Sequence, residues 1–312
     1  DRNLPNSTTV TVSVREQGTN RPVQNAVVTL SSDDANTLWV VGNTARLTTI
    51  QVVTDSNGQG QASFYASTKA QKVTITAEFD PGTGIQRKTA TITQVPGPAL
   101  LTVRSNFTTI FVRLPDTFTT ADGQVHNYAN LPGNSNNKAQ ITAIVADANG
   151  NPYADIPVTF SATDGVVAQS AVTDSNGEAV VDYSPPAVIP SGGQVTVVAQ
   201  ATVGNQTLNN QATLQVRSGP PAVVQIASNP TELPADGTST AVVTATVQDA
   251  NGNLVRDGVS VELKLTSRPA SDTKWLPSGT DTITLSTVNG QVSAILVAGL
   301  KAGVAAVRAT AS

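Results

Sequence analysis

The chain has 312 residues, a formal net charge of −4 and only 13% charged residues, which is about half the usual share. Phosphate binding needs a concentrated basic surface, so this balance argues against nucleic acid as a partner. The chain has no Cys, which excludes disulfides, thiolate metal sites and thiol catalysis, and no apolar run is long enough to cross a membrane.

Apolar residues make up 39% of the chain and aromatic residues only 4%. The cores must therefore be built mainly from Val, Ala, Leu and Ile. Val and Thr are abundant, and β-branched side chains favour strands. Gly, Pro, Asn or Asp interrupts every stretch that could form a helix. The composition predicts an all-β protein.

The first predicted domain, residues 1–95, contains a strand–turn–strand segment, a second turn and a closing strand. These elements are residues 14–31, Thr54-Asp-Ser-Asn-Gly58 and residues 72–77. Their strands alternate apolar and polar residues, as half-buried strands do. The domain starts late in this pattern, so we expect its opening strand to be missing or replaced by residues 1–9.

The second predicted domain, residues 96–217, begins after Val95-Pro-Gly-Pro98 and repeats the three elements at residues 145–161, 173–183 and 194–199. It also carries an insertion at about residues 106–138, which holds a large share of the few aromatic residues.

The third predicted domain, residues 218–312, begins after Ser218-Gly-Pro-Pro221 and repeats the elements at residues 247–264, 287–296 and 303–309. Both linkers are short and contain Pro, so we expect them to be stiff. The repeats therefore predict three tandem β-sandwiches arranged as an elongated rod.

The turns of these repeats are rich in Asn-Gly pairs. Asn-Gly supplies the positive φ that both central residues of a two-residue hairpin need. The pairs therefore predict hairpins within each repeat, at Asn57-Gly58, Asn149-Gly150, Asn176-Gly177, Asn251-Gly252 and Asn289-Gly290.

These motifs resemble the bacterial Ig-like domain of group 1, the Big-1 module of invasin and intimin surface proteins. The residues that carry the resemblance are Asp147-Ala-Asn-Gly-Asn-Pro-Tyr-Ala-Asp-Ile-Pro-Val-Thr-Phe160, Thr173-Asp-Ser-Asn-Gly-Glu-Ala179, Asp249-Ala-Asn-Gly-Asn253 and Gly258-Val-Ser-Val-Glu-Leu263. The first domain departs from the pattern, because Glu16-Gln-Gly18 replaces Asp-Ala-Asn-Gly. The resemblance implies immunoglobulin-like sandwiches of seven to nine strands, extracellular on a bacterial surface, in which most repeats are spacers.

Five aromatic residues are the weak candidates for a binding site. Trp39 and Trp275 occupy similar places in the first and third domains, where each plugs an open end of the sandwich or grips a sugar or protein. Phe111, Phe118 and Tyr128 lie in the insertion, which forms a packed loop, an interdomain buttress or a binding site.

No residue pattern indicates catalysis or a cofactor. His126 is the only His, so a Ser-His-Asp site would have to form around it, and surface or loop packing is the simpler interpretation. A calcium loop of the EF-hand type needs Glu at its twelfth position, where a count from Asp147 reaches Val158. A weak interdomain calcium site near Asp80, or built from Asp116 and Asp122, stays as an alternative.

We therefore expect a non-enzymatic spacer segment of a large invasin/intimin-like surface protein that contributes to adhesion or cell–cell contact. Its expected partners are the neighbouring Ig-like domains of the same chain and a host or bacterial surface protein or glycan. One alternative is a module that binds carbohydrate or protein through the insertion. Another is an accessory module of a secreted enzyme.

Overall fold

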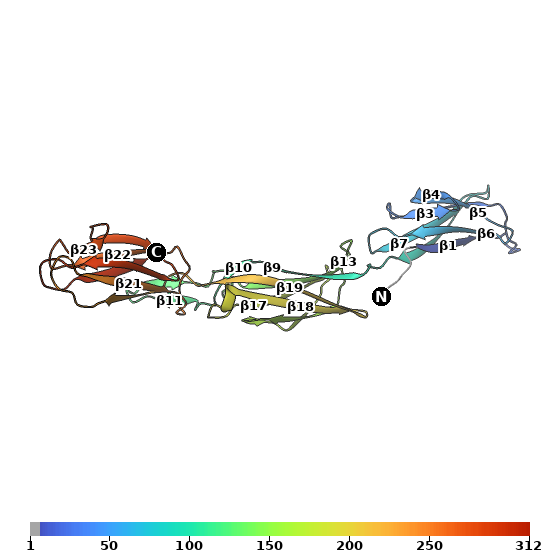
Figure 1. The fold of residues 1–312 in the computed structure, drawn as a ribbon. Helices are drawn as coiled ribbons and strands as arrows, with labels where there is room; N and C mark the ends of the chain where they lie inside the picture. Colours follow the sequence, from blue (N-terminus) through green and yellow to red (C-terminus); the bar gives the residue numbers. More distant parts are fainter. Residues whose placement is uncertain (1–6) are drawn as a thin grey trace.

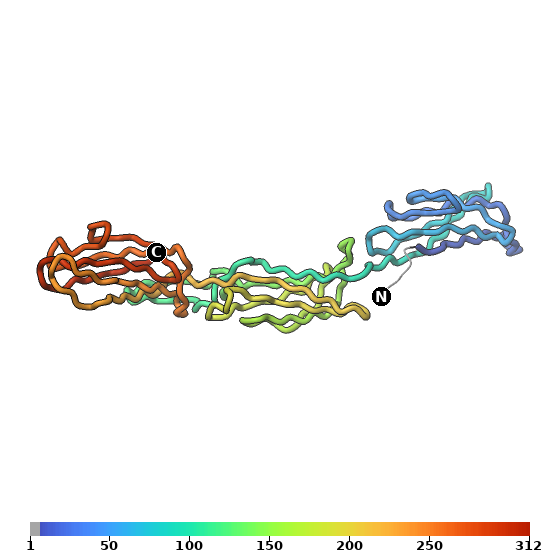
Figure 2. Tube along the Cα trace, viewed as in Figure 1, coloured from blue at the N-terminus to red at the C-terminus, as the bar shows by residue number. Residues whose placement is uncertain are grey.

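The computed structural model describes residues 7–312 as three β-sandwiches that follow one another along an elongated rod (Figure 1). Each sandwich packs two sheets face to face, and a single tube of chain leads from the first sandwich to the second (Figure 2). Within the described residues the one helical element is a 3₁₀ turn, Ser191–Gly193. The predicted all-β fold of three tandem immunoglobulin-like domains is confirmed.

The first sandwich contains strands β1 to β8, in the sheets β1-β6-β3-β4 and β5-β2-β7-β8. Their bounds are β1 Ser7–Ser13, β2 Val27–Ser32, β3 Leu38–Val41, β4 Thr44–Leu47, β5 Thr49–Val53, β6 Gln59–Tyr65, β7 Lys72–Phe79 and β8 Gln86–Thr93.

The second sandwich contains the sheets β15-β17-β13-β9 and β10-β19-β18-β14-β16, with a separate β11-β12 hairpin. The bounds are β9 Ala99–Ser105, β10 Thr109–Phe111, β11 Thr117–Thr119, β12 Val125–Asn127, β13 Ala139–Asp147, β14 Pro157–Ala162, β15 Val166–Val167, β16 Ser170–Val172, β17 Glu178–Ser184, β18 Gln194–Val203 and β19 Gln206–Arg217.

The third sandwich contains the sheets β20-β21-β25-β23 and β24-β22-β26. The bounds are β20 Val223–Asn229, β21 Thr240–Gln248, β22 Ser260–Ser267, β23 Lys274–Leu276, β24 Thr282–Ser286, β25 Gln291–Val297 and β26 Ala306–Ala311. One sandwich thus ends and the next begins between β8 and β9 and between β19 and β20. The residue limits 1–95, 96–217 and 218–312 of the domains stay a prediction.

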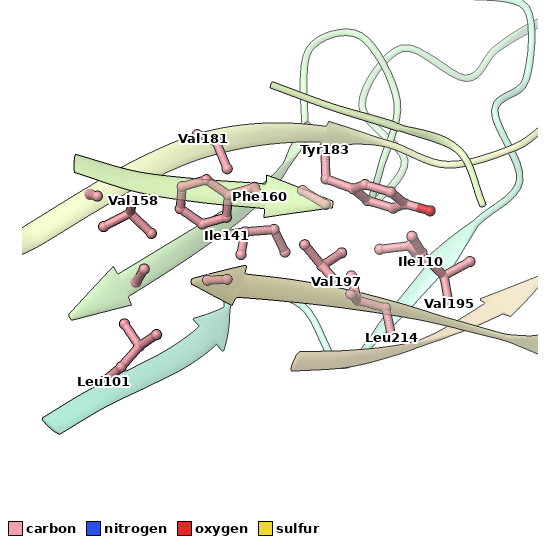
Figure 3. Close-up of a cluster of buried hydrophobic side chains, with 14 of the residues drawn as sticks. Leu101, Ile110, Ile141, Val158, Phe160, Val181, Tyr183, Val195, Val197 and Leu214 are labelled. Atoms are coloured by element: carbon pink, nitrogen blue, oxygen red, sulfur yellow. The ribbon is translucent and has the colours of Figure 1, made fainter. Parts of the chain in front are cut away.

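Each sandwich has its own hydrophobic cluster of mainly aliphatic side chains. Strand β13 shows how the sequence pattern builds it, because its alternate residues Ala139, Ile141, Ala143 and Val145 are wholly buried. Figure 3 shows part of this second cluster, where side chains from both sheets meet. The cores are therefore filled mainly by Val, Ala, Leu and Ile, as the scarcity of aromatic residues predicted.

The first sandwich differs from the other two at one sheet edge. Strand β1 occupies the position of β13 and β21, but in the described residues nothing corresponds to β9 and β20, which cover the outer edges of those strands. Val10 and Val12 are consequently only half-buried, whereas Ala143 is wholly buried. The prediction that residues 1–9 replace an opening strand falls partly on residues 1–6, which lie outside the described residues.

The prediction of two-residue hairpins is wrong for four of the five Asn-Gly turns, and the strands before and after all five turns belong to different sheets. Strands β13 and β14, joined by the turn with Asn149-Gly150, belong to opposite sheets, and so do β16 and β17. Positive φ occurs at Gly150 and Gly177 but not at the preceding Asn. Asn289-Gly290 alone has positive φ at both residues, and the prediction holds there, because the backbones of Val288 and Gln291 bond each other in both directions around the turn. The long strands on either side, β24 and β25, nevertheless belong to different sheets.

The second turn of each repeat is fixed by a buried Thr. The hydroxyl of Thr54 donates to the carbonyl of Val23 at 2.6 Å and accepts the amide of Ala26 at 2.9 Å. Thr173 and Thr287 make the same pair of bonds to the backbone of their own domains. This Thr therefore joins the two turns of every sandwich, and buried backbone groups that would otherwise lack partners are satisfied.

Candidate functional site at the interdomain junctions

The Asp-Ala-Asn-Gly-Asn turns lie where one sandwich meets the preceding one. In the turn after β13, Asp147 Oδ1 accepts the backbone amides of Asn149 and Asn151 at 2.8 and 2.9 Å. In the turn after β21, Asp249 Oδ1 accepts the amides of Asn251 and Asn253, both at 2.9 Å. The first residue of the motif thus shapes the turn through its carboxylate.

The second carboxylate oxygen ties the turn to the linker in front of its domain. Asp147 Oδ2 accepts the amide of Gly97 at 2.8 Å, and Asp249 Oδ2 accepts the amide of Gly219 at 2.9 Å. Both carboxyl groups are buried, with 6% and 0% of the residue exposed. Each linker is therefore fastened to the domain that follows it.

The last Asn of the motif reaches across the junction. Asn151 Nδ2 donates to the carbonyl of Thr68 at 2.7 Å, and its Oδ1 accepts the amide of Ala70 at 2.7 Å. An amide side chain is both donor and acceptor, so one residue satisfies a backbone carbonyl and a backbone amide of the first sandwich together. Asp147 Oδ2 accepts the same Nδ2 at 2.8 Å and holds the Asn in this orientation.

The second junction repeats this arrangement. Asn253 Nδ2 donates to the carbonyl of Ala187 at 2.9 Å, and its Oδ1 accepts the amide of Ile189 at 3.2 Å. Asn251 Nδ2 adds bonds to the carbonyls of Arg113 and Ala187. At each junction, one Asp and one Asn four residues apart thus bind two backbone groups of the preceding sandwich. We call this unit the junction clamp.

The electrostatics of the clamp favour an ionised Asp147. Burial by itself would raise the pKa of this carboxyl, but hydrogen bonds from the Asn151 side chain and from the amide of Gly97 outweigh burial and lower the pKa below its ordinary value of 3.8. We call the loop of the first sandwich that the clamp binds, which contains residues 68–70, the acceptor loop. It is held by another carboxylate. The carboxylate of Asp34 accepts Ser67 Oγ at 2.6 Å and Gln71 Nε2 at 2.8 Å.

The two junctions differ in how their space is filled. A cavity of about 400 Å³ lies at the first junction, lined by Phe64, Ile92, Pro96 and the turn residues Asn149 and Asn151, among others.

At the second junction the insertion occupies the corresponding region. A Cβ on Gly219 would lie 2.8 Å from the side chain of Leu114, and Ala250 of the third sandwich packs on the cluster that contains Tyr128. This packing favours the interdomain buttress among the alternatives predicted for the insertion.

Of the five candidate binding residues, three are buried and two are half-buried. Trp39 and Trp275 are 0% exposed, and Trp39 meets the ring of Phe64 edge to face at 5.0 Å. Tyr128 is 4% exposed, and burial, followed by the charge of Asp249, raises the pKa of its phenol. Phe118 is half-buried against the second cluster, and Phe111 is half-buried. The burial of the two indoles favours the packing interpretation over ligand binding, and a binding role of the five residues stays a prediction.

The residues weighed for chemistry are dispersed. His126 lies on β12 and stacks on Tyr128 with ring centroids 6.1 Å apart. Asp80 accepts the amide of Gly82, Asp116 bonds Ser135 and Asp122 bonds Thr120. Across residues 7–312, no group of three or more His, Asp and Glu side chains is placed to hold a metal ion. Over the same residues, no helix is long and apolar enough to span a bilayer.

Comparison with known proteins gives two family matches. Residues 125–216 match the bacterial Ig-like domain (group 1), and residues 220–312 match domain 3 of invasin. Both are Ig-like domains of adhesins rather than enzyme families. The inverse autotransporter adhesin YeeJ of Escherichia coli K12 is 31% identical over 129 residues, which are 40% of this chain and 5% of the adhesin.

Solved structures of adhesins align with this chain at lower identity. The Escherichia coli adhesin FdeC aligns with a TM-score of 0.48 and 16% identity, over 98% of this chain and 92% of FdeC. Invasin, described as a bacterial integrin-binding protein, aligns with a TM-score of 0.45 and 15% identity, over 97% of this chain and 56% of invasin. The family matches identify residues 125–216 and 220–312 as bacterial Ig-like domains resembling those of the invasin/intimin family of surface adhesins.

Proposed function

We propose that this chain is a rigid spacer segment of a bacterial cell-surface adhesin, which holds an adhesive part of a longer protein away from the cell. The observation that carries the proposal is the junction clamp, which is built twice from the same two residue types, as Asp147 with Asn151 and as Asp249 with Asn253. A spacer needs fixed angles between its domains, and bonds from a preorganised turn to backbone groups limit those angles more strictly than a flexible linker does.

The matched relative supports the setting of this function. YeeJ is named as an inverse autotransporter adhesin, and the matched stretch is 5% of its length, as a repeated spacer unit would be. In this proposal the segment is extracellular, and the host or bacterial surface protein or glycan is bound elsewhere in the longer protein. The burial of Tyr128 supports packing over ligand binding by the insertion.

The proposal is tested by small-angle X-ray scattering of the chain and of the double variant Asn151→Ala/Asn253→Ala. Three sandwiches whose strands span about 30 Å each predict a rod with a maximum dimension on the order of 100 Å. The double variant should give a broader distribution of shapes with unchanged circular dichroism. A compact profile of the unaltered chain, or identical profiles of both proteins, would contradict the spacer role.

A further inference from the structure

The junction clamp binds two backbone groups at fixed positions of the sandwich in front of it. In the first sandwich these are the carbonyl four residues after Phe64 and the amide six residues after it, Thr68 and Ala70. In the second sandwich they are the carbonyl four residues after Tyr183 and the amide six residues after it, Ala187 and Ile189. The acceptor loop thus has the same register in both cases.

The third sandwich contains the same loop after β25. Leu296 corresponds to Phe64, because it pairs with Trp275 as Phe64 pairs with Trp39. It also follows Gly290 by six residues, as Phe64 follows Gly58. The equivalent backbone groups are therefore the carbonyl of Leu300 and the amide of Ala302.

These two groups are free. Within residues 7–312, no hydrogen bond reaches the carbonyl of Leu300 or leaves the amide of Ala302. Leu300 and Val304 are also strongly exposed for apolar residues, at 73% and 83%. Strand β25 begins beside the second junction, where Val247 donates to the carbonyl of Gly290, so the loop at its other end lies away from the second sandwich (Figure 1).

The loop is nevertheless held in place by its own domain. Asp272 Oδ2 accepts the amide of Leu300 at 2.8 Å, in the manner in which Asp34 holds the acceptor loop of the first sandwich through Ser67. The exposed Leu300 side chain also lies close to Gly237, where an added Cβ would be 3.1 Å from it. A held loop with an unpaired carbonyl and an unpaired amide is preorganised for a partner.

We propose that the loop of residues 298–303 is a third docking site for a junction clamp, whose occupant is the Asp-x-x-x-Asn turn of another bacterial Ig-like domain. The inference extends the proposed spacer function and rests on it. The carboxamide of the incoming Asn donates to Leu300 and accepts from Ala302, as Asn151 and Asn253 do at the two occupied sites.

A second copy of this chain has no unoccupied turn of this kind, because its Asn151 and Asn253 are already bonded to the preceding sandwiches of that copy. In the first sandwich, the amide of Glu16 donates to the carbonyl of Arg21, as the amide of Asp147 donates to the carbonyl of Asn151. Arg21 therefore stands at the position of the clamp Asn. A guanidinium group has no acceptor atom, so it cannot receive the amide of Ala302. The partner must be a domain that carries both Asp and Asn in its turn.

The test uses the full chain as receptor and a turn-transplant chain as probe. In the probe, residues 16–21 are replaced by Asp-Ala-Asn-Gly-Asn, the sequence of residues 147–151. The receptor is labelled with ¹⁵N, and the amide resonance of Ala302 is followed by NMR while unlabelled probe is added to about 1 mM, a concentration that detects millimolar binding. We expect a saturable shift at Ala302, loss of the response at neighbouring amides in the receptor variant Ala302→Pro, and no shift with the unaltered chain as probe.

A matched probe carries Asp-Ala-Asn-Gly-Ala, which lacks only the terminal carboxamide. The docking site is refuted if Ala302 does not shift with the first probe, or if the matched probe shifts it equally. The scattering experiment on Asn151→Ala/Asn253→Ala is independent of this titration. If that variant loosens the chain but Ala302 does not respond, the spacer function stands and the third docking site falls; if the variant does not loosen the chain, the spacer function itself falls.

Discussion

The buried hydroxyl of Thr287 provides a quantitative test of how the two turns of a sandwich are joined. It donates to the carbonyl of Arg256 at 2.8 Å and accepts the amide of Val259 at 3.0 Å, and the residue is 1% exposed. The substitution Thr287→Val keeps the shape of the side chain and removes both bonds. A buried amide left without a partner costs about 1–3 kcal/mol, and the lost bond to the carbonyl adds about 0.5–1.5 kcal/mol.

We therefore expect Thr287→Val to lower the free energy of unfolding of the third sandwich by about 2–4 kcal/mol. Trp275, which is 0% exposed, reports this unfolding through its fluorescence, and a Trp39→Phe background makes it the only Trp of the chain. With a slope of about 1–3 kcal/mol per molar urea, the midpoint should fall by on the order of 1–2 M.

The matched control is Thr287→Ser, which retains the hydroxyl and loses one methyl group. It should cost about 1 kcal/mol. The reasoning is refuted if Thr287→Val unfolds within 0.5 M urea of its parent, about a quarter of the largest expected shift. It is equally refuted if the Ser variant is as unstable as the Val variant.

Three further predictions concern the turns. Asn151→Ala removes two interdomain bonds, worth about 1–3 kcal/mol together, so spin labels on introduced Cys residues in the first and second sandwiches should report a broader distance distribution, whereas Asn149→Ala, in the same turn but without a side-chain bond across the junction, should leave it narrow. The pKa of Asp147 is lowered in the folded protein, so the contribution of its carboxylate to stability is complete above the ordinary value of 3.8 and is lost as pH falls through the lower folded value. The same distance distribution should therefore stay constant from about pH 8 to about pH 5, which is about one unit above the ordinary value, and should broaden only in stronger acid. Gly177→Ala would place a Cβ 2.5 Å from the carbonyl of Val145 at φ +75°, whereas Gly150→Ala meets nothing within 4 Å at φ +83°; thermal unfolding should show the first to be clearly more destabilising, and equal effects would contradict this difference.

The strand pattern of the sequence was enough to predict the layers of the fold. Alternation along residues 139–147 places one face of β13 in the core, since successive side chains of a strand point to opposite faces. The threefold repetition of the strand and turn motifs predicted three similar units. The sheet to which each strand belongs could not be predicted, because a turn between two strands looks alike whether it closes a hairpin or crosses between sheets.

The sequence determined that an Asp and an Asn recur four residues apart in two of the three domains, but their use as a clamp was decided by the tertiary structure. A carboxamide pairs equally well with its own turn, with water or with a neighbouring backbone. Only the placement of residues 68–70 and 187–189 opposite Asn151 and Asn253 selects the last of these. The two Trp residues could likewise be found in the sequence, but whether their side chains face solvent or the core could not. That depends on strand pairing between residues 20 or more positions apart in the chain, such as Trp275 with Leu296 and Trp39 with Phe64.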